Sequence, residues 1–377
     1  MSRCGRRRFL KHSLAFAATL PISAAQGADA LAPSQECVTL ARCQTYKDAE
    51  VRRALETCFT LLGGIAPLVH GKTVTVKVNL TGHNFSPFRG LPPGETYMTH
   101  FSTAYHLAAL VFASGARRVR FVESIGRRTP LEPVLVEAGW DLTALGALGT
   151  MTYENTRNRG SFESYARLKA PSGHMFSSFE LNRAYDDTDL VVSLARLKQH
   201  GTTGVTLTMK NMFGITPNSM YGGRPGDEDS VAGRGPIHDP RRYVDLELPG
   251  LKPGFQSTEA GVRVPCTIAD LCAARPVDLA IIDGISAMTG GENPYSSGPR
   301  TRIARPGVII VGRNPVSVDA VGTLVMGFDP RAVRGTGVFA RCENHLLLAE
   351  QKGLGTADPG RIDVRGLTLE EARHPYA

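Results

Sequence analysis

The sequence predicts an α/β fold in which a mostly parallel sheet is covered by helices on both faces. Several short segments consist of continuous apolar, β-branched residues, and this pattern is typical of strands that are buried on both faces. The segments between them carry the start and stop signals of helices. Strands that alternate with helices along a chain indicate a layered α/β domain.

Five segments are predicted to be strands. Each contains an apolar, β-branched run that ends at a polar or charged residue. They are residues 73–80, 117–124, 189–198, 277–284 and 307–314.

Two helices are predicted from the residues at their ends. Residues 102–115 begin with the hydroxyl side chain of Ser102 and stop at Gly115. Residues 314–327 begin with Asn314 as the N-cap and Pro315 in the first helical position, and Gly327 ends them. These residue types are preferred at helix ends.

The N-terminal residues follow the order of a secretory signal. Three consecutive arginines occupy residues 6–8, an apolar run follows over residues 14–25, and small residues end it. This order predicts a twin-arginine signal peptide over residues 1–28, a periplasmic or otherwise exported protein, and the twin-arginine translocation machinery as a partner. The run contains Pro21 and is shorter than the roughly 20 residues that span a bilayer, so no stable membrane span is predicted.

The rest of the chain is predicted to be one α/β core with extensions. Residues 29–70 form an N-terminal extension, residues 71–335 the core, and residues 336–377 a C-terminal extension. Within the core, residues 221–262 are dense in glycine, proline and charge. So long a segment is either a functional flap or a disordered insertion, and its arginines and His238 could cover an anionic ligand.

Charge and cysteine spacing exclude several classes of protein. Five of the eight net positive charges lie before residue 12, and no basic run with interleaved aromatic residues follows, so nucleic-acid binding is not expected. The six cysteines after the signal contain no C-x-x-C pair, which argues against a zinc or iron–sulfur site. Cys37 with Cys43, or Cys266 with Cys272, could form disulfides in an oxidising compartment, and buried reduced thiols are the equal alternative.

Polar side chains gather where the predicted strands end, which is where ligands bind in open α/β sheets. The segment over residues 198–218 is the richest, because it combines ammonium, imidazole and amide groups with glycines that allow close backbone approach. Such a set suits a phosphate or carboxylate, with the imidazole free to move a proton. The alternative is a solvated loop beside a polar helix face. The candidate catalytic residues are Lys198, His200, Lys210 and Asp283, and the candidate ligand-binding residues are Lys77, Asn79, Asn211 and Glu123.

Two aspartates are candidate metal ligands. Asp283 ends a predicted strand and Asp319 lies in the first turns of a predicted helix, so the pair could meet across neighbouring strands and hold a divalent metal or act as acid and base. Each also has a structural alternative. Asp283 could cap the turn that follows it, and the negative charge of Asp319 near the helix N-terminus could interact favourably with the helix dipole.

Familiar catalytic and nucleotide-binding motifs are not found. The sequence contains no G-x-x-x-x-G-K-[ST] loop, no convincing G-x-G-x-x-G after a strand, no G-x-S-x-G and no H-E-x-x-H. A simple ATP or dinucleotide site, a serine hydrolase and a zinc protease of the common kind are therefore disfavoured.

Four motifs together resemble the family catalogued as domain of unknown function 362. They occupy residues 76–80, 197–214, 278–299 and 308–330, in the family's order. The resemblance implies an α/β domain and a site at Lys198, His200, Lys210, Asn211, Asp283 and Asp319. Many members carry an iron–sulfur segment, but this sequence has no such cysteine array, so no iron–sulfur cluster is expected.

These observations lead to an exported α/β protein of unassigned reaction. We expect an enzyme or cofactor-handling protein that binds a small anionic or metal-associated ligand at the C-terminal rim of its sheet. The alternative is a periplasmic module that binds a small anion without catalysis. The cofactor is unknown, and a divalent metal is one candidate.

Overall fold

The computed structural model describes residues 36–81, 85–294 and 301–376. The predicted signal peptide over residues 1–28 lies outside the described residues. Within them, no helix combines the length and the apolar character needed to cross a membrane.

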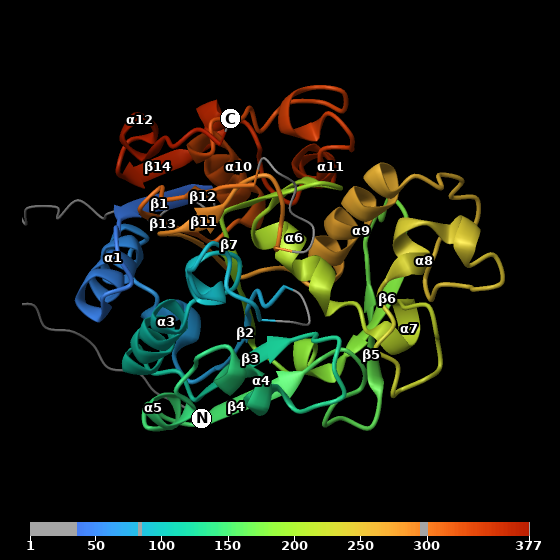
Figure 1. Cartoon of the computed structure of the whole chain (residues 1–377), viewed down its shortest axis with the longest axis horizontal. Coiled ribbons are helices and arrows are strands. Elements are labelled where there is room, and N and C mark those ends of the chain that lie inside the picture. The colour runs from blue at the N-terminus through green and yellow to red at the C-terminus, as the bar shows by residue number, and fades with distance from the viewer. Residues whose placement is uncertain (1–35, 82–84, 295–300, 377) are drawn as a thin grey trace, which may run out of the picture. The chain divides into compact units, whose positions relative to one another are not determined.

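The described residues form an eight-stranded sheet with the order β14-β1-β13-β10-β7-β2-β3-β4 (Figure 1). Strand β13 runs against both of its neighbours, and every other pair in the sheet is parallel. A mostly parallel sheet is thus confirmed, and each of the five predicted segments supplies one strand. The strands are β1 (Cys37–Arg42), β2 (Thr73–Lys77), β3 (Arg118–Glu123), β4 (Met151–Asn155), β7 (Leu190–Arg196), β10 (Leu279–Gly284), β13 (Val308–Gly312) and β14 (Asp363–Gly366).

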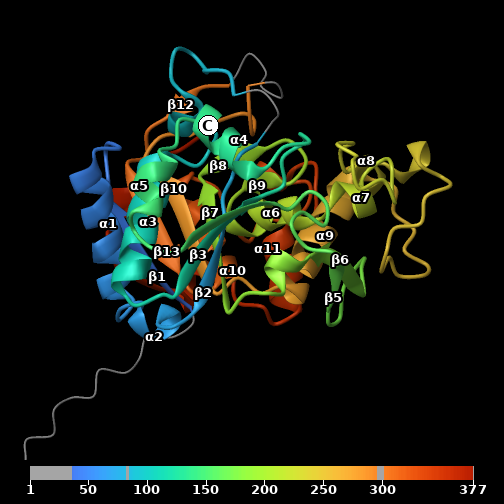
Figure 2. The ribbon, with the colours of Figure 1, turned by 90° about the horizontal axis from the view of Figure 1, so that it is seen from below.

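Helices cover both faces of this sheet, as the continuous apolar strands predicted. Helices α1 (Asp48–Leu61) and α3 (Phe101–Ala113) lie on one side, and α6 (Thr208–Met212), α9 (Ala260–Ala274) and α10 (Pro315–Val325) lie on the other (Figure 2). The shorter helices are α2 (Ala66–Val69), α4 (Leu131–Glu137), α5 (Leu142–Gly146), α7 (Asn218–Tyr221), α8 (Gly235–His238), α11 (His345–Gln351) and α12 (Leu369–Ala372). Three small two-stranded antiparallel sheets pair β5 (Tyr165–Lys169) with β6 (Ser178–Asn182), β8 (Lys198–His200) with β9 (Gly204–Thr206), and β11 (Ala287–Met288) with β12 (Ile303–Ala304).

The two faces of the sheet bury separate apolar cores. Successive side chains of a strand point to opposite faces. In β13, Val308 and Ile310 therefore join the core beneath α10, while Ile309 and Val311 join the core beneath α1 and α3. All four side chains are buried. Because both faces of the strand are covered by apolar cores, its sequence is a continuous apolar run and not an alternation of apolar and polar residues.

One predicted helix start is confirmed and the other is corrected. Asn314 caps α10, and its side chain accepts hydrogen bonds from the backbone N–H groups of Val316 and Ser317. Helix α3 begins at Phe101 and not at Ser102. Its cap is His100, whose Nδ1 accepts from the Ser102 backbone N–H at 3.0 Å. Burial lowers the pKa of His100 to about 4, so the ring is neutral and can accept this bond.

The strand order reverses between β2 and β7. From β2 the chain continues to β3 and then β4 on one side, and β7 later pairs with the other side of β2. In open α/β sheets ligands bind beyond the carboxyl ends of the strands at such a reversal. The fold thus points to the ends of β2, β3 and β7 as the place to look for a site.

Candidate functional site

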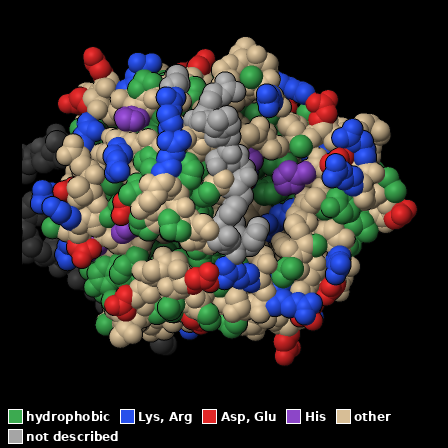
Figure 3. All heavy atoms as spheres, in the orientation of Figure 1, with side chains coloured by type: hydrophobic (Ala, Val, Ile, Leu, Met, Phe, Trp, Pro, Cys, Tyr) green, Lys and Arg blue, Asp and Glu red, His purple; other side chains and the backbone are tan. Residues whose placement is uncertain are grey.

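A pocket of about 510 Å³ opens at the carboxyl ends of β2 and β3. We call it the rim pocket. The side chains used below that line it are Lys77, Asn79, Glu123, His200, Lys210, Asn211, Phe213, Arg234, His238 and Glu292. The face of the molecule in Figure 3 is hollowed beside histidine and Lys or Arg side chains, the residue types that line this pocket.

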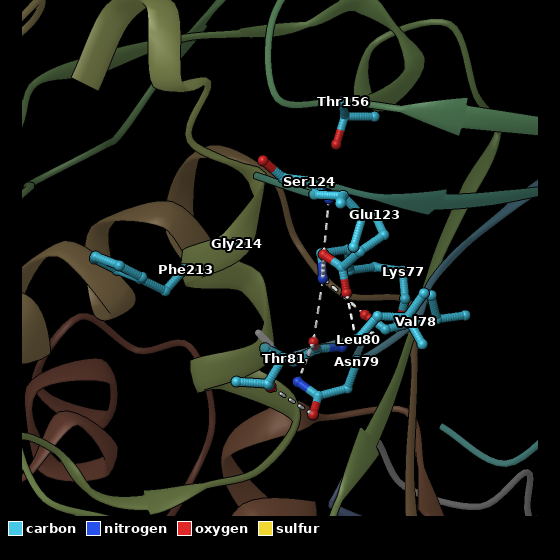
Figure 4. A network of polar contacts seen from close by, with 12 residues as sticks. Lys77, Val78, Asn79, Leu80, Thr81, Glu123, Ser124, Thr156, Phe213 and Gly214 are labelled. Atoms are coloured by element: carbon cyan, nitrogen blue, oxygen red, sulfur yellow. Dashed lines mark hydrogen bonds and ion pairs between the residues drawn. The ribbon is translucent and has the colours of Figure 1, made fainter. Parts of the chain in front are cut away.

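Lys77 and Glu123 form a buried ion pair on the floor of the rim pocket. They end the neighbouring parallel strands β2 and β3 and point toward each other, with Lys77 Nζ 2.5 Å from Glu123 Oε1 (Figure 4). The ammonium also donates to the Val78 carbonyl, and the carboxylate accepts from the backbone N–H groups of Leu80 and Ser124. Gly214 makes room for the pair, because a Cβ on it would lie 3.2 Å from Lys77 Nζ.

Asn211 joins β2, β7 and α6 in one hydrogen-bond network. Its Oδ1 accepts from Asn79 Nδ2 and Lys77 Nζ, and its Nδ2 donates to the Lys77 carbonyl and Ser193 Oγ. Both donors and both acceptor positions of the amide are thus used within the chain. Asn211 was predicted to bind ligand, and the structure places it as a buried junction that positions α6 at the pocket.

Lys198 lies fully buried just behind the rim pocket. Its ammonium has acceptors in Asn79 Oδ1, Thr81 Oγ1 and the backbone carbonyls of Tyr97 and Glu292, at 2.8 to 3.2 Å. Burial lowers the pKa of Lys198 to about 7. A lysine with all of its donors engaged holds segments together, and here it ties the Glu292 segment to the end of β2.

His200 and Glu292 form a hydrogen-bonded pair at the mouth of the pocket, with Nε2 3.0 Å from Oε2. The Thr202 backbone N–H donates to His200 Nδ1, so in the neutral ring Nε2 carries the hydrogen and donates to the carboxylate. Burial lowers the pKa of His200. Burial raises the pKa of Glu292, but the bond from His200 and the charges of Lys210 and Lys198 outweigh it, so the net shift is downward. The pair is therefore a neutral imidazole against an ionised carboxylate.

Three basic side chains surround the ring of Phe213. Lys210 Nζ lies 4.9 Å and Arg234 Cζ 5.9 Å from the ring centroid, and the His238 ring packs edge-on at 5.4 Å. Within the described part of the chain, the Lys210 ammonium has no hydrogen bond and no ion pair. Arg234 uses Nε and Nη2 on oxygens of Ser124, Gly214 and Thr216, which leaves its Nη1 without a partner among the described residues.

The pocket holds more positive than negative charge. Three basic side chains line it, Lys77, Lys210 and Arg234, against two acidic ones, Glu123 and Glu292. Burial lowers the pKa of Lys210, and the nearby charges of Arg234 and Lys77 lower it further against the opposing effect of Glu292. Burial also lowers the pKa of Arg234 to about 10. Such unpaired positive charge is the feature that attracts an anion.

Asp283 does not join the other predicted catalytic residues. In the sheet register it stands beside Arg196 of β7, and the two buried side chains pair at 2.7 Å. Its oxygens also accept hydrogen bonds from Tyr46 and Thr103. They accept another from the Ile285 backbone N–H, which is the contact expected if Asp283 caps the turn that follows its strand. The Asp283 carboxylate is thus engaged by Arg196 and does not line the rim pocket, unlike His200 and Lys210, so it is not part of this site as predicted.

Asp319 lies in a different network from Asp283. It accepts from the backbone N–H groups of Thr208 and Met209 and from Thr208 Oγ1, so it caps the first turn of α6 from the neighbouring helix α10. Burial raises the pKa of Asp319 to about 7. Within the described ranges, no three His, Cys, Asp or Glu side chains are grouped to hold a metal ion. The predicted pairing of these aspartates around a metal is thus not formed.

Part of the long segment over residues 221–262 reaches the rim pocket. Arg234 and His238 line it, and the His238 Nδ1 hydrogen bonds to the Arg234 carbonyl. Arg241 and Arg242 instead pair with Asp239 on the surface. The sequence analysis considered the arginines and His238 of this segment as a cover for an anionic ligand. Phe213 and Glu292 were not among the candidate catalytic or ligand-binding residues.

A family model described as Domain of unknown function (DUF362) matches residues 74–323, which is more than half of the chain. The chain belongs to the DUF362 family. The match runs from β2 into α10 and includes both lysines that flank the threonine-rich stretch, Lys198 and Lys210. The family resemblance of the sequence motifs is thereby confirmed, and a family of unknown function supplies no reaction.

Other proteins resemble this DUF362 chain more distantly. Thylakoid-associated protein sll1697 of Synechocystis sp. is 24% identical over 297 residues, which cover 78% of this chain and 76% of that protein. A crystal structure of a Thermotoga maritima protein has a TM-score of 0.38 and 13% sequence identity. That likeness covers 76% of this chain and 61% of the Thermotoga maritima chain.

Proposed function

We propose that this DUF362 protein binds a small anion, a carboxylate or an oxyanion such as sulfate or phosphate, in the rim pocket. The observation that carries the proposal is the Lys210 ammonium, which faces the pocket without a partner among the described residues. Arg234 Nη1 offers a second unpaired donor beside the same aromatic ring. Both the location at the strand-order reversal and the excess of positive charge support it.

The pocket also contains a group suited to moving a proton. His238 donates from Nδ1 to the Arg234 carbonyl, so Nε2 of the neutral ring is an acceptor, and no described residue hydrogen bonds to it. Burial and the nearby positive charge of Lys210 lower the pKa of His238. The ring is therefore uncharged at neutral pH, and its Nε2 can accept a proton. This group favours an enzyme over a protein that only captures the anion.

Calorimetric titration with sulfate and with lactate tests the binding proposal. We expect both anions to bind, and we expect Lys210→Gln and Arg234→Gln each to weaken binding by about 10- to 100-fold, since a hydrogen bond to a charged group contributes about 1.5–3 kcal/mol. Lys169→Gln, at an exposed lysine of β5, is the matched control and should bind as the wild type does. Equal affinities for all four proteins, or no binding of either anion to the wild type, would overturn the proposal.

We also propose that the protein is exported through the twin-arginine route. The arginines at positions 6–8 and the short apolar run after them support this destination. Its binding partner during export is then the twin-arginine translocation machinery.

A further inference from the structure

The three lysines around the rim pocket differ in what their ammonium groups touch. Lys77 is paired with Glu123 and hydrogen bonded to two further oxygens, and Lys198 is surrounded by four oxygen acceptors. Both are buried, at 1% and 0% exposure. Lys210 is half-buried and lines the pocket, its nitrogen lies over the Phe213 ring, and it has no hydrogen bond to any described residue. Of the three, Lys210 is the one whose nitrogen a ligand atom can approach.

We propose that Lys210 forms a covalent imine with the carbonyl carbon of a small 2-oxo acid whose carboxylate binds Arg234. The proposal rests on the proposed anion binding and names the ligand class for it. A 2-oxo acid places a carboxylate directly beside a ketone carbon. In the rim pocket, an unpaired guanidinium nitrogen for the carboxylate and an unpaired amine for the ketone lie beside the same aromatic ring.

The neutral amine is the form of lysine that attacks a carbonyl, and the surroundings of Lys210 favour it. Burial and the charges of Arg234 and Lys77 lower its pKa, and Glu292 opposes them only in part. Desolvation and a neighbouring cation are the two usual ways in which a protein activates a lysine as a nucleophile. Lys198 has a lowered pKa as well, but its acceptors enclose it.

The step balances without a redox partner. The nitrogen lone pair of Lys210 forms a bond to the ketone carbon, and the carbonyl oxygen takes up a proton and becomes a hydroxyl group. That hydroxyl leaves as water after a second proton transfer, while the nitrogen loses its hydrogens to form the C=N bond. His238 Nε2, which has no hydrogen-bond partner among the described residues, is placed on the same ring to accept and return the proton.

Reductive trapping on the full-length protein tests this inference. The protein is incubated with pyruvate and sodium borohydride, and the product is analysed by intact mass and peptide mapping. We expect one reduced pyruvate adduct, located on Lys210. Lys210→Arg should show at least tenfold less adduct, while the exposed-site control Lys169→Arg should be trapped as the wild type is. Lactate has the same carboxylate but no ketone, so it should bind without forming an adduct.

The outcomes separate this inference from the proposed function. If pyruvate binds in calorimetry but no adduct forms, or if the adduct sits on another lysine, the imine is overturned and anion binding stands. If neither pyruvate nor sulfate binds, both proposals fall. Sulfate binding that survives in Lys210→Arg, together with loss of trapping, supports an imine and excludes a collapsed pocket as the cause.

Discussion

The residues of the rim pocket have different roles although their types are alike. Lysine, histidine and asparagine at the strand ends were predicted to form the site, and the structure brings Lys77, Asn79, Lys198, His200, Lys210 and Asn211 together there. The sequence could not tell which lysine is free. That depends on acceptors far along the chain, such as Asn79 for Lys198, 119 residues away.

The pH dependence of anion binding follows from the state of Lys210. Its pKa is lowered in the folded protein, and an anion is attracted to the ammonium and not to the amine. Sulfate affinity should therefore fall as the pH rises through that pKa, below the usual lysine value near 10.4. Sulfate keeps its charge over this range, so the change reports the protein.

Lys210→Arg is the variant that isolates this titration, because a guanidinium stays charged throughout the range. Titrations from about pH 6 to about pH 10 should show a smaller loss of sulfate affinity in the variant than in the wild type. Lys198, with a pKa of about 7, contributes an equal loss to both proteins. Parallel pH curves would show that Lys210 does not bind the anion. Pyruvate trapping should rise over the same range, since it needs the amine.

At the scale of elements, the segments that the sequence predicted best are those specified by neighbouring residues. Asn314, Pro315 and Gly327 mark α10 within one stretch of chain. Helix α6 has no such local signals. It spans residues 208–212 and its cap is the carboxylate of Asp319, 111 residues later. The site is built on this short element, so its geometry depends on tertiary contacts that local patterns do not reveal.

The β8–β9 hairpin that leads into α6 offers a matched pair of glycines. Gly204 has φ of +76°, and a Cβ on it would lie 2.8 Å from the Phe339 ring and 2.9 Å from the Val338 carbonyl. Gly201 has open space around its Cβ position. Gly204→Ala should reduce the free energy of unfolding by about 1–3 kcal/mol, because it adds backbone strain and a close contact.

Gly201→Ala should change the free energy of unfolding by less than about 0.5 kcal/mol, as expected of a surface substitution. Urea denaturation of the two variants beside the wild type measures both effects. Similar stabilities for the two variants would mean that the hairpin does not pack against Phe339 as described. Because the hairpin carries His200 and precedes Lys210, Gly204→Ala should also weaken sulfate binding.

At the scale of the whole molecule, the sheet extends further than the predicted core. β1 and β14 come from the segments predicted as N- and C-terminal extensions, yet they pair with each other and β1 pairs with β13. β14 is polar and partly exposed, as an edge strand often is, so it lacks the continuous apolar run of the central strands. A continuous apolar run, which identifies the buried central strands, therefore cannot predict an edge strand of this kind.

The six cysteines of the described residues are all buried free thiols. Neither of the cysteine pairs considered from sequence is bonded, and Cys266 and Cys272 both lie within helix α9. Burial raises the pKa of Cys43 and of Cys58 to about 12. Both thiols therefore stay protonated near neutral pH, and the reactive thiolate does not form. A chain threaded unfolded into an oxidising compartment would expose all six to oxidation before folding. A chain that folds first buries them, and the twin-arginine route carries folded proteins.

Replacing the proposed signal peptide tests this link between thiols and the proposed export. With the native N-terminal segment, cell fractionation should find the protein in the periplasm, and alkylation after unfolding should count six free thiols in the exported chain. Changing Arg6, Arg7 and Arg8 to lysine should keep it in the cytoplasm. A leader for the general secretory route should give an exported chain with fewer free thiols and a lower thermal stability, because non-native disulfides trap it. Undiminished export of the lysine variant would contradict the route, and equal thiol counts from the two leaders would contradict the reason given for it.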